Sequence, residues 1–213
     1  MVNKLKVGFS KNKDFVGDVD IALFGFGAFS EISFKSELAG KSQTLSDMAK
    51  TSKALGAVCF FGVDTDSYGL KRRSVVCSYD GKILGISDSN FKNSDKISVS
   101  HGYKIYNTDK GRFGVLVDDI CNVDAIKCFS DCECDAIIAL SGDFLKFRAD
   151  FLCQSLSFLY GISICYFCGD TVIMCAPNGE LSFYSNEKCA SALLCTKRKY
   201  TEYTVKTRGE IKK

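Results

Sequence analysis

A chain of 213 residues, 46% hydrophobic and 25% charged, has the length and composition of one globular domain and leaves no room for a second full one. It contains no apolar run of the roughly 18 residues that a membrane-spanning helix needs, and its first residues lack the apolar core of a secretion signal. We therefore expect a cytoplasmic protein without a membrane segment, and the net charge of +3 is too small to indicate a nucleic-acid-binding domain.

The charge is unevenly distributed along the chain. Residues 1–196 are predicted to form the domain, and residues 197–213 a basic tail with seven basic and two acidic residues. Only Tyr200 and Tyr203 could stack on bases, so we expect a solvated tail. The alternative, a nucleic-acid binder acting through this tail, predicts salt-sensitive binding that is lost when the tail is deleted.

Twelve cysteines would indicate disulfides in a small secreted protein, but the expected location is reducing. Most of them lie inside apolar runs, where cysteine behaves as a small buried hydrophobic residue. Reduced core thiols are therefore expected at Cys59, Cys77, Cys165, Cys175 and Cys195.

Two cysteine spacings are suggestive of a metal site, namely Cys128-x3-Cys132-x-Cys134 and Cys165-x2-Cys168. A structural zinc site needs four ligands, and strand alternation points Cys165 and Cys168 to opposite faces of a sheet. The only histidine, His101, cannot complete a site alone. The sequence thus predicts neither a metal nor a cofactor.

The first elements are two strands at residues 5–9 and 19–24, and the nine residues between them are too few for a helix with its connections. A helix is predicted over residues 44–55, with a capping box from Thr44 to Asp47 and a stop at Gly56. Its buried face would consist of Leu45, Met48, Ala49, Ser52 and Leu55.

The middle of the chain is predicted to be rich in strands. A buried strand at residues 57–63 is followed by a hairpin of residues 74–79 and 82–87, in which Asp80-Gly81 supplies the positive φ angles of a tight turn. Two further strands are expected at residues 103–107 and 113–117.

In the last third, strands alternate with helices. A short helix marked by Val123, Ile126 and Phe129 leads to a strand at residues 135–140. Asp143 is predicted to cap a longer helix that ends at Gly161. Its expected buried stripe is Leu145, Ala149, Leu152, Leu156 and Leu159. Strands are then expected at residues 162–167, 171–176, 180–184 and 190–195.

Hairpins mixed with helix-bearing crossovers predict an α/β protein in which two mixed sheets pack together and helices cover their outer faces. Four segments in chain order support a particular version of this fold. They are Ser74-Val-Val-Cys-Ser-Tyr-Asp-Gly-Lys-Ile-Leu-Gly85, Gly102-Tyr-Lys-Ile-Tyr106 with Gly111-Arg-Phe-Gly-Val-Leu-Val117, Cys134-Asp-Ala-Ile-Ile-Ala-Leu-Ser141, and Asp170-Thr-Val-Ile-Met-Cys-Ala-Pro-Asn-Gly-Glu-Leu181.

These segments resemble the nitrilase, or carbon–nitrogen hydrolase, superfamily, and the match covers about residues 5–195. The resemblance implies a four-layer α/β/β/α sandwich, here shortened because the first family helix is missing between residues 9 and 19. It also implies dimers formed by packing one sandwich against another, so a homodimer or another protein partner is expected.

Family members use a Glu, a Lys and a Cys to hydrolyse amides or nitriles, with the thiolate as nucleophile. Carried over by position, the glutamate falls on Phe26, the lysine on Ser89 and the cysteine on Asp118. An aspartate cannot form the usual thioester, and the other two positions lack the base and the cation. The resemblance therefore predicts a pseudoenzyme that acts as a binding or interaction module.

The alternative is an active amidase-type hydrolase that acts on small amides or nitriles through Glu31, Lys92 and Cys121. Glu31 lies five positions after Phe26, Lys92 three after Ser89 and Cys121 three after Asp118. A shift of three positions along a strand turns a side chain to the other face, so this alternative would need a bulge at each site. A third interpretation gives Asp118 and Asp119 a shared role in cation binding, although adjacent strand residues diverge.

Overall fold

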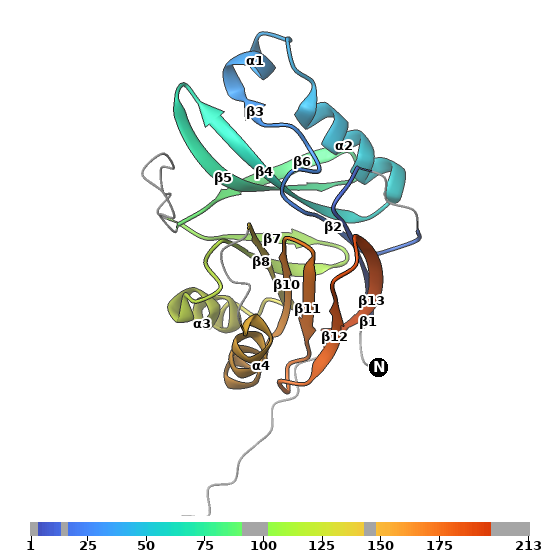
Figure 1. Cartoon of the computed structure of the whole chain (residues 1–213), viewed down its shortest axis with the longest axis vertical. Helices are drawn as coiled ribbons and strands as arrows, with labels where there is room; N and C mark the ends of the chain where they lie inside the picture. Colours follow the sequence, from blue (N-terminus) through green and yellow to red (C-terminus); the bar gives the residue numbers. More distant parts are fainter. Residues whose placement is uncertain (1–3, 14–16, 91–101, 143–147, 197–213) are drawn as a thin grey trace, which may run out of the picture.

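The computed structural model describes residues 4–13, 17–90, 102–142 and 148–196. Within these ranges the chain forms two mixed β-sheets that pack face to face, with helices on both outer faces (Figure 1). This arrangement is the predicted α/β/β/α sandwich.

The first sheet has the strand order β13-β1-β2-β4-β5-β6. Strands β1, β2 and β4 run parallel, whereas β5 and β13 pair antiparallel with their neighbours. A two-residue strand, β3, pairs with the end of β4. The bounds are β1 (Lys4–Ser10), β2 (Ile21–Phe24), β3 (Ile32–Ser33), β4 (Val58–Ser67), β5 (Leu70–Tyr79), β6 (Lys82–Asp88) and β13 (Cys189–Cys195).

The second sheet has the order β12-β11-β10-β9-β8-β7. Its centre consists of three parallel strands, β8, β9 and β10, which are connected through helices. Hairpins complete both edges. The bounds are β7 (Lys104–Thr108), β8 (Gly111–Val117), β9 (Ala136–Ser141), β10 (Ser163–Cys168), β11 (Thr171–Cys175) and β12 (Leu181–Ser185).

Helices cover the outer face of each sheet. On the first sheet, α1 (Phe34–Leu38) and α2 (Thr44–Leu55) pack over a cluster that includes Met48, Phe24 and Phe61. On the second sheet, α3 (Val123–Asp131) and α4 (Ala149–Tyr160) pack over the opposite face. The described residues between β1 and β2 form no helix, as the short gap predicts.

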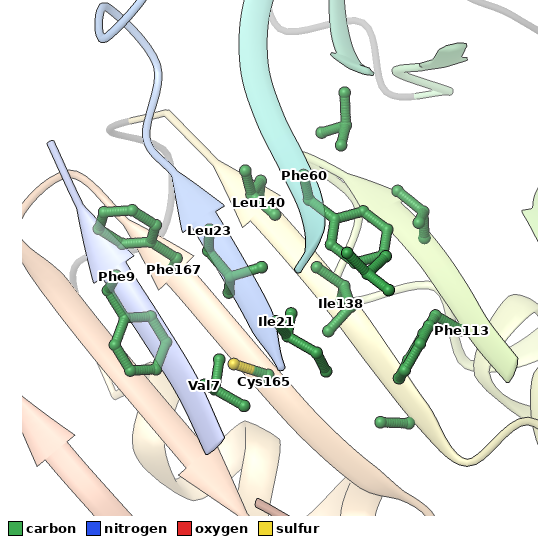
Figure 2. Close-up of a cluster of buried hydrophobic side chains, with 14 of the residues drawn as sticks. Val7, Phe9, Ile21, Leu23, Phe60, Phe113, Ile138, Leu140, Cys165 and Phe167 are labelled. Carbon is green, nitrogen blue, oxygen red and sulfur yellow. The ribbon is translucent and has the colours of Figure 1, made fainter. Parts of the chain in front are cut away.

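The central core lies between the two sheets (Figure 2). Side chains alternate along each strand, so every second residue of both sheets points into this layer. Phe9 of β1 meets Phe167 of β10 edge to face, with ring centroids 6.1 Å apart. The labelled members are Val7, Phe9, Ile21, Leu23 and Phe60 from the first sheet, and Phe113, Ile138, Leu140, Cys165 and Phe167 from the second.

The strand and turn predictions are confirmed. Asp80 and Gly81 adopt φ angles of 48° and 73° in the hairpin between β5 and β6, and Gly56 ends α2 in the left-handed region. Cys165 and Cys168 point into different core clusters, as strand alternation requires. The short elements β3 and α1 were not predicted, because neither is long enough to show a periodic pattern of hydrophobic residues.

Three details were wrong. The N-cap of α2 is Gln43 and not Thr44, because the first helical hydrogen bond runs from the Asp47 amide to the Gln43 carbonyl at 2.9 Å. Leu159 is 68% exposed, because the buried stripe of α4 runs through Ala149, Cys153 and Leu156 instead. Cys195 is only half-buried, since it lies in the edge strand β13. The predicted cap Asp143 and the stripe residue Leu145 lie outside the described residues.

Candidate functional site at the carboxyl ends of the strands

The carboxyl ends of parallel strands from both sheets meet at one place. Gly25 directly follows β2, and a Cβ atom there would lie 3.1 Å from the ring of Phe167 near the end of β10. In open α/β sheets, ligands bind outside the carboxyl ends of the strands. This edge is therefore where a functional site is expected, and all three family positions lie along it.

Asp118 occupies a strained turn directly after β8. Its φ angle of 55° places a non-glycine residue in the left-handed region. The backbone amide donates to the carbonyl of Leu140 at 3.0 Å, and carboxylate Oδ1 accepts from the amide of Gly142 at 2.8 Å. The side chain is fully buried. The chain thus turns sharply at the end of β8 and presents this carboxylate inward.

Arg73 of β5 reaches across from the other sheet to this carboxylate. Its Nη1 lies 3.4 Å from Oδ2 of Asp118, and its Nε lies 3.6 Å from Oδ1 of Asp64, its cross-strand partner. A Cβ atom on Gly142 would lie only 2.0 Å from Nη1. Because Gly142 has no side chain, the Arg73 guanidinium can occupy the space where a Cβ atom would otherwise lie.

Phe26 completes the enclosure of Arg73. The guanidinium lies over the Phe26 ring, 4.8 Å from its centroid, in cation–π geometry. On its other side Phe26 packs on the backbone of β4, where a Cβ atom on Gly62 would approach the Phe26 amide nitrogen and ring at 3.0–3.1 Å. Phe26, the residue at the position that the resemblance assigns to the glutamate, thus contacts the Arg73 guanidinium.

Ser89 follows β6 and is buried. Its amide donates to the carbonyl of Arg73 at 2.8 Å, which extends the pairing of β5 with β6 by one residue. Phe26, Asp118 and Ser89, the three residues that the resemblance singled out, therefore all contact Arg73. Phe26 does so through its ring, Asp118 through its carboxylate and Ser89 through its backbone.

The environment of Asp118 acts on its pKa in both directions. Burial raises the pKa of this carboxyl above its ordinary value, while the Gly142 amide and the Arg73 charge oppose the rise. The net direction is upward, so removal from water outweighs the ion pair.

The displaced residues of the alternative triad are not brought together among the residues described. Cys121 is exposed in the turn before α3, and partial burial and the Asp119 carboxylate raise the pKa of its thiol. Glu31 pairs with Lys71 at 3.0 Å and directly precedes β3, which lies at the opposite end of the molecule from α3 (Figure 1). Lys92 lies outside the described residues, as does His101.

Asp118 and Asp119 have separate partners. The Asp119 carboxylate accepts from the hydroxyl of Tyr103 and from Nδ2 of Asn122, whereas Asp118 faces Arg73 and Gly142. In the part of the chain that the structure describes, no three Cys, His, Asp or Glu side chains gather as a metal site would require.

A cavity of about 180 Å³ lies beside this edge, between the start of α4 and β10 to β12. Cys168 closes one side, and its thiol donates to the carbonyl of Gly142. None of the three family positions lines this cavity. Its lining residues are Arg148, Ala149, Asp150, Cys168, Thr171, Ile173 and Tyr184.

Sequence reasoning missed Arg73 as a member of this site. The signal was present, because Arg72 and Arg73 are consecutive charges directly before the apolar run of β5. The sequence alone does not show which of the two arginines faces the second sheet. In the structure Arg73 does, whereas Arg72 pairs with Asp88 of its own sheet at 3.1 Å.

The comparisons with known proteins find no matching family model and no matching curated protein. Solved structures do match. Nit3 of Saccharomyces cerevisiae, a member of branch 10 of the nitrilase superfamily, superposes with a TM-score of 0.75 at 12% identity, covering 90% of each chain. The carbon–nitrogen hydrolase of Helicobacter pylori G27 gives a TM-score of 0.72 at 12% identity, covering 91% of this chain and 89% of that one.

A third similar structure is an amidase from Nesterenkonia sp. AN1, whose active-site cysteine carries an acetamide group from fluoroacetamide. It gives a TM-score of 0.72 at 7% identity and covers 90% of each chain. The chain therefore has a nitrilase-like fold. None of the helices in the described ranges has the length and apolar character needed to cross a bilayer.

Proposed function

We propose that this chain is a nitrilase-like carbon–nitrogen hydrolase domain that has lost the Glu-Lys-Cys reaction and acts as a binding or subunit-interaction module. The observation that carries the proposal is the ion pair of Arg73 with Asp118 at the turn after β8, enclosed by Phe26. Two of these side chains, Phe26 and Asp118, stand at positions that the resemblance assigns to the catalytic glutamate and cysteine, which supports the proposal.

The chemistry of the three positions supports the proposal. Phe26 offers no proton acceptor, and Ser89 carries no charge that could stabilise an oxyanion. The Asp118 carboxylate is a far weaker nucleophile than a thiolate, and Gly142 and Arg73 already engage both of its oxygens. Arg73 supplies a positive charge, but a guanidinium stays protonated and cannot act as an acid or base.

The test is ammonia release from a panel of small aliphatic amides and nitriles by the wild-type chain and two variants. Cys121→Ser removes the nucleophile of the alternative triad, and Cys189→Ser removes an equally exposed thiol as the matched control. We expect no saturable release by any of the three proteins. Release that is lost only in Cys121→Ser would replace this proposal with the active amidase built on Glu31, Lys92 and Cys121.

The interaction role is supported by an apolar stripe on α4. Phe151, Phe158 and Leu159 are 53%, 55% and 68% exposed, and their spacing puts them on one side of the helix. Large apolar side chains exposed together on one side of a helix are a common feature of protein interfaces. We propose that a second copy of the chain covers it.

Sedimentation velocity over a range of concentrations tests the dimer. We expect the wild-type chain to sediment as a dimer and Leu159→Glu as a monomer. Leu38→Glu is the control, because Leu38 is 80% exposed but lies on α1, on the other outer face. Equal sedimentation of both variants with the wild type would show that α4 is not the interface.

The cysteines support a cytoplasmic location as part of the same proposal. All twelve are free thiols, although several lie close together in the core. Disulfides are rare in reducing compartments and common in oxidising ones. Thiol titration of the denatured protein, purified without reductant, should therefore detect the full set of thiols.

A further inference from the structure

Cys128 and Cys132 lie side by side on the last turn of α3. They are four positions apart in the sequence, and Cys132 is the C-cap of the helix. Side chains at this spacing lie on the same face of a helix. The Cys132 amide donates to the Cys128 carbonyl at 2.9 Å, so the helical spacing holds up to Cys132. Cys128 is exposed and Cys132 is half-buried.

The third cysteine of this sequence motif takes no part. Cys134 is fully buried and packs in the core beneath α3 and α4. A four-thiolate metal site is therefore out of reach here, and the surface presents a pair of thiols.

The spacing of the pair favours a bridging atom over a direct sulfur–sulfur bond. Residues four apart on a helix have Cβ atoms about 5–6 Å apart, whereas a disulfide needs Cβ atoms about 3.5–4.5 Å apart. A disulfide would thus require the helix end to distort. An atom that binds both sulfurs spans the longer gap with α3 intact.

We propose that Cys128 and Cys132 form a two-thiol site that captures a trivalent arsenical. An arsenoxide, R–As=O, condenses with both thiols to form two As–S bonds. The two S–H bonds break, and their protons leave with the arsenic-bound oxygen as one water molecule. No electron is gained or lost, so the step needs no oxidant.

The charges around the pair suit an uncharged adduct. Partial burial, the neighbouring Cys132 and the Asp131 carboxylate all raise the pKa of Cys128, so its protonated thiol predominates at neutral pH. Asp131 itself is held by Lys127 at 3.1 Å, one turn along the same helix face. Condensation with an arsenoxide leaves no charge on the sulfurs, so this environment does not oppose it.

Phenylarsine oxide and intact-mass spectrometry test the proposal. The folded chain is treated with the reagent in the presence of excess glutathione, which competes for single thiols but not for paired ones. We expect one phenylarsenic adduct per chain, located by proteolysis on the peptide containing residues 128–132 and removed by dithiothreitol.

Two variants and a control sharpen the test. Cys128→Ser and Cys132→Ser should each lose the glutathione-resistant adduct, while Cys121→Ser and Cys189→Ser, which remove other exposed thiols, should keep it. An adduct that survives in Cys128→Ser, that maps to another peptide, or that is absent from the wild-type chain would overturn the proposal. Peptide mapping on the wild-type chain keeps the test valid even if a variant folds poorly.

Discussion

Arg73 and Asp118 form an ion pair that joins the two sheets at their carboxyl edge, with Nη1 and Oδ2 3.4 Å apart. Arg73 belongs to β5 of one sheet and Asp118 follows β8 of the other. The Asp118 side chain is fully buried, and that of Arg73 is 22% exposed. The pair therefore connects the two sheets at the carboxyl ends of their parallel strands.

Replacing Arg73 by methionine should lower the free energy of unfolding by about 2 kcal/mol, because the buried Asp118 carboxylate would lose its cation. Urea denaturation measures the change. The control is Lys71→Met, which removes an exposed ion pair with Glu31 and should change stability little. Equal effects of the two substitutions would mean that the Arg73 pair contributes no more than a surface contact.

Gly142→Ala should destabilise the fold by about 1–3 kcal/mol. The added Cβ atom would lie 2.0 Å from Nη1 of Arg73, so the guanidinium would have to move away and lose its ion pair with the buried Asp118 carboxylate. Gly102→Ala is the control, since a Cβ atom there meets nothing within 4 Å. The cost of Gly142→Ala should shrink in the Arg73→Met background, where the guanidinium is gone. Additive effects in this double-mutant cycle would contradict a steric cause.

The titration of Asp118 predicts how stability depends on pH. Its pKa is raised in the folded chain, so the folded state binds this proton more tightly than the unfolded state does. The contribution of this group is therefore greatest below its ordinary pKa of 3.8 and is lost as the pH rises through the folded pKa.

Asp118→Asn isolates this contribution, because it removes the titration and keeps an oxygen that accepts from the Gly142 amide. The free energy of unfolding of the wild type minus that of the variant should fall with rising pH and then level off. Urea denaturation series from pH 3 to 7 provide the measurement. A difference that grows with pH would show that the ion pair, and not burial, dominates.

Gly114→Ala should cost about 1–3 kcal/mol, because a Cβ atom on β8 would lie 2.5 Å from the Phe129 ring of α3. Thermal or urea unfolding reports the loss. Phe129→Leu in the same chain should restore part of it by making room, although the leucine alone is destabilising. If the loss of unfolding free energy in the double variant equals the sum of the losses in the two single variants, then contact with Phe129 is not the reason that Gly114→Ala is destabilising.

The local features of this fold were predictable because they depend on residues close in sequence. Asp80 and Gly81 both have positive φ angles, as the Asp-Gly pair favours in a two-residue hairpin turn. Gly56 ends α2 in the left-handed region, which glycine adopts at no steric cost. The nine residues between the first two predicted strands were too few for a helix with its connections, and the described residues between β1 and β2 form none. Leu159 was mispredicted because a helix stripe depends on where the helix lies against its sheet, and not only on its period.

The candidate site was only partly predictable. Phe26, Ser89 and Asp118 were named from the order of motifs along the chain, whereas Arg73 was not. Its ion pair, its stacking on Phe26 and the space at Gly142 depend on how two sheets pack face to face. Their partners lie 45 or more positions apart in the sequence, as for Arg73 and Asp118.

By itself, then, the sequence determined the strands, the turns and the residue types at the three family positions, because hydrophobic period and turn chemistry act over a few neighbouring residues. Only the tertiary structure decided that these positions meet around Arg73 and that Glu31 and Cys121 stand apart. The reason is physical: packing between sheets places side chains in contact according to three-dimensional position, which local patterns do not encode.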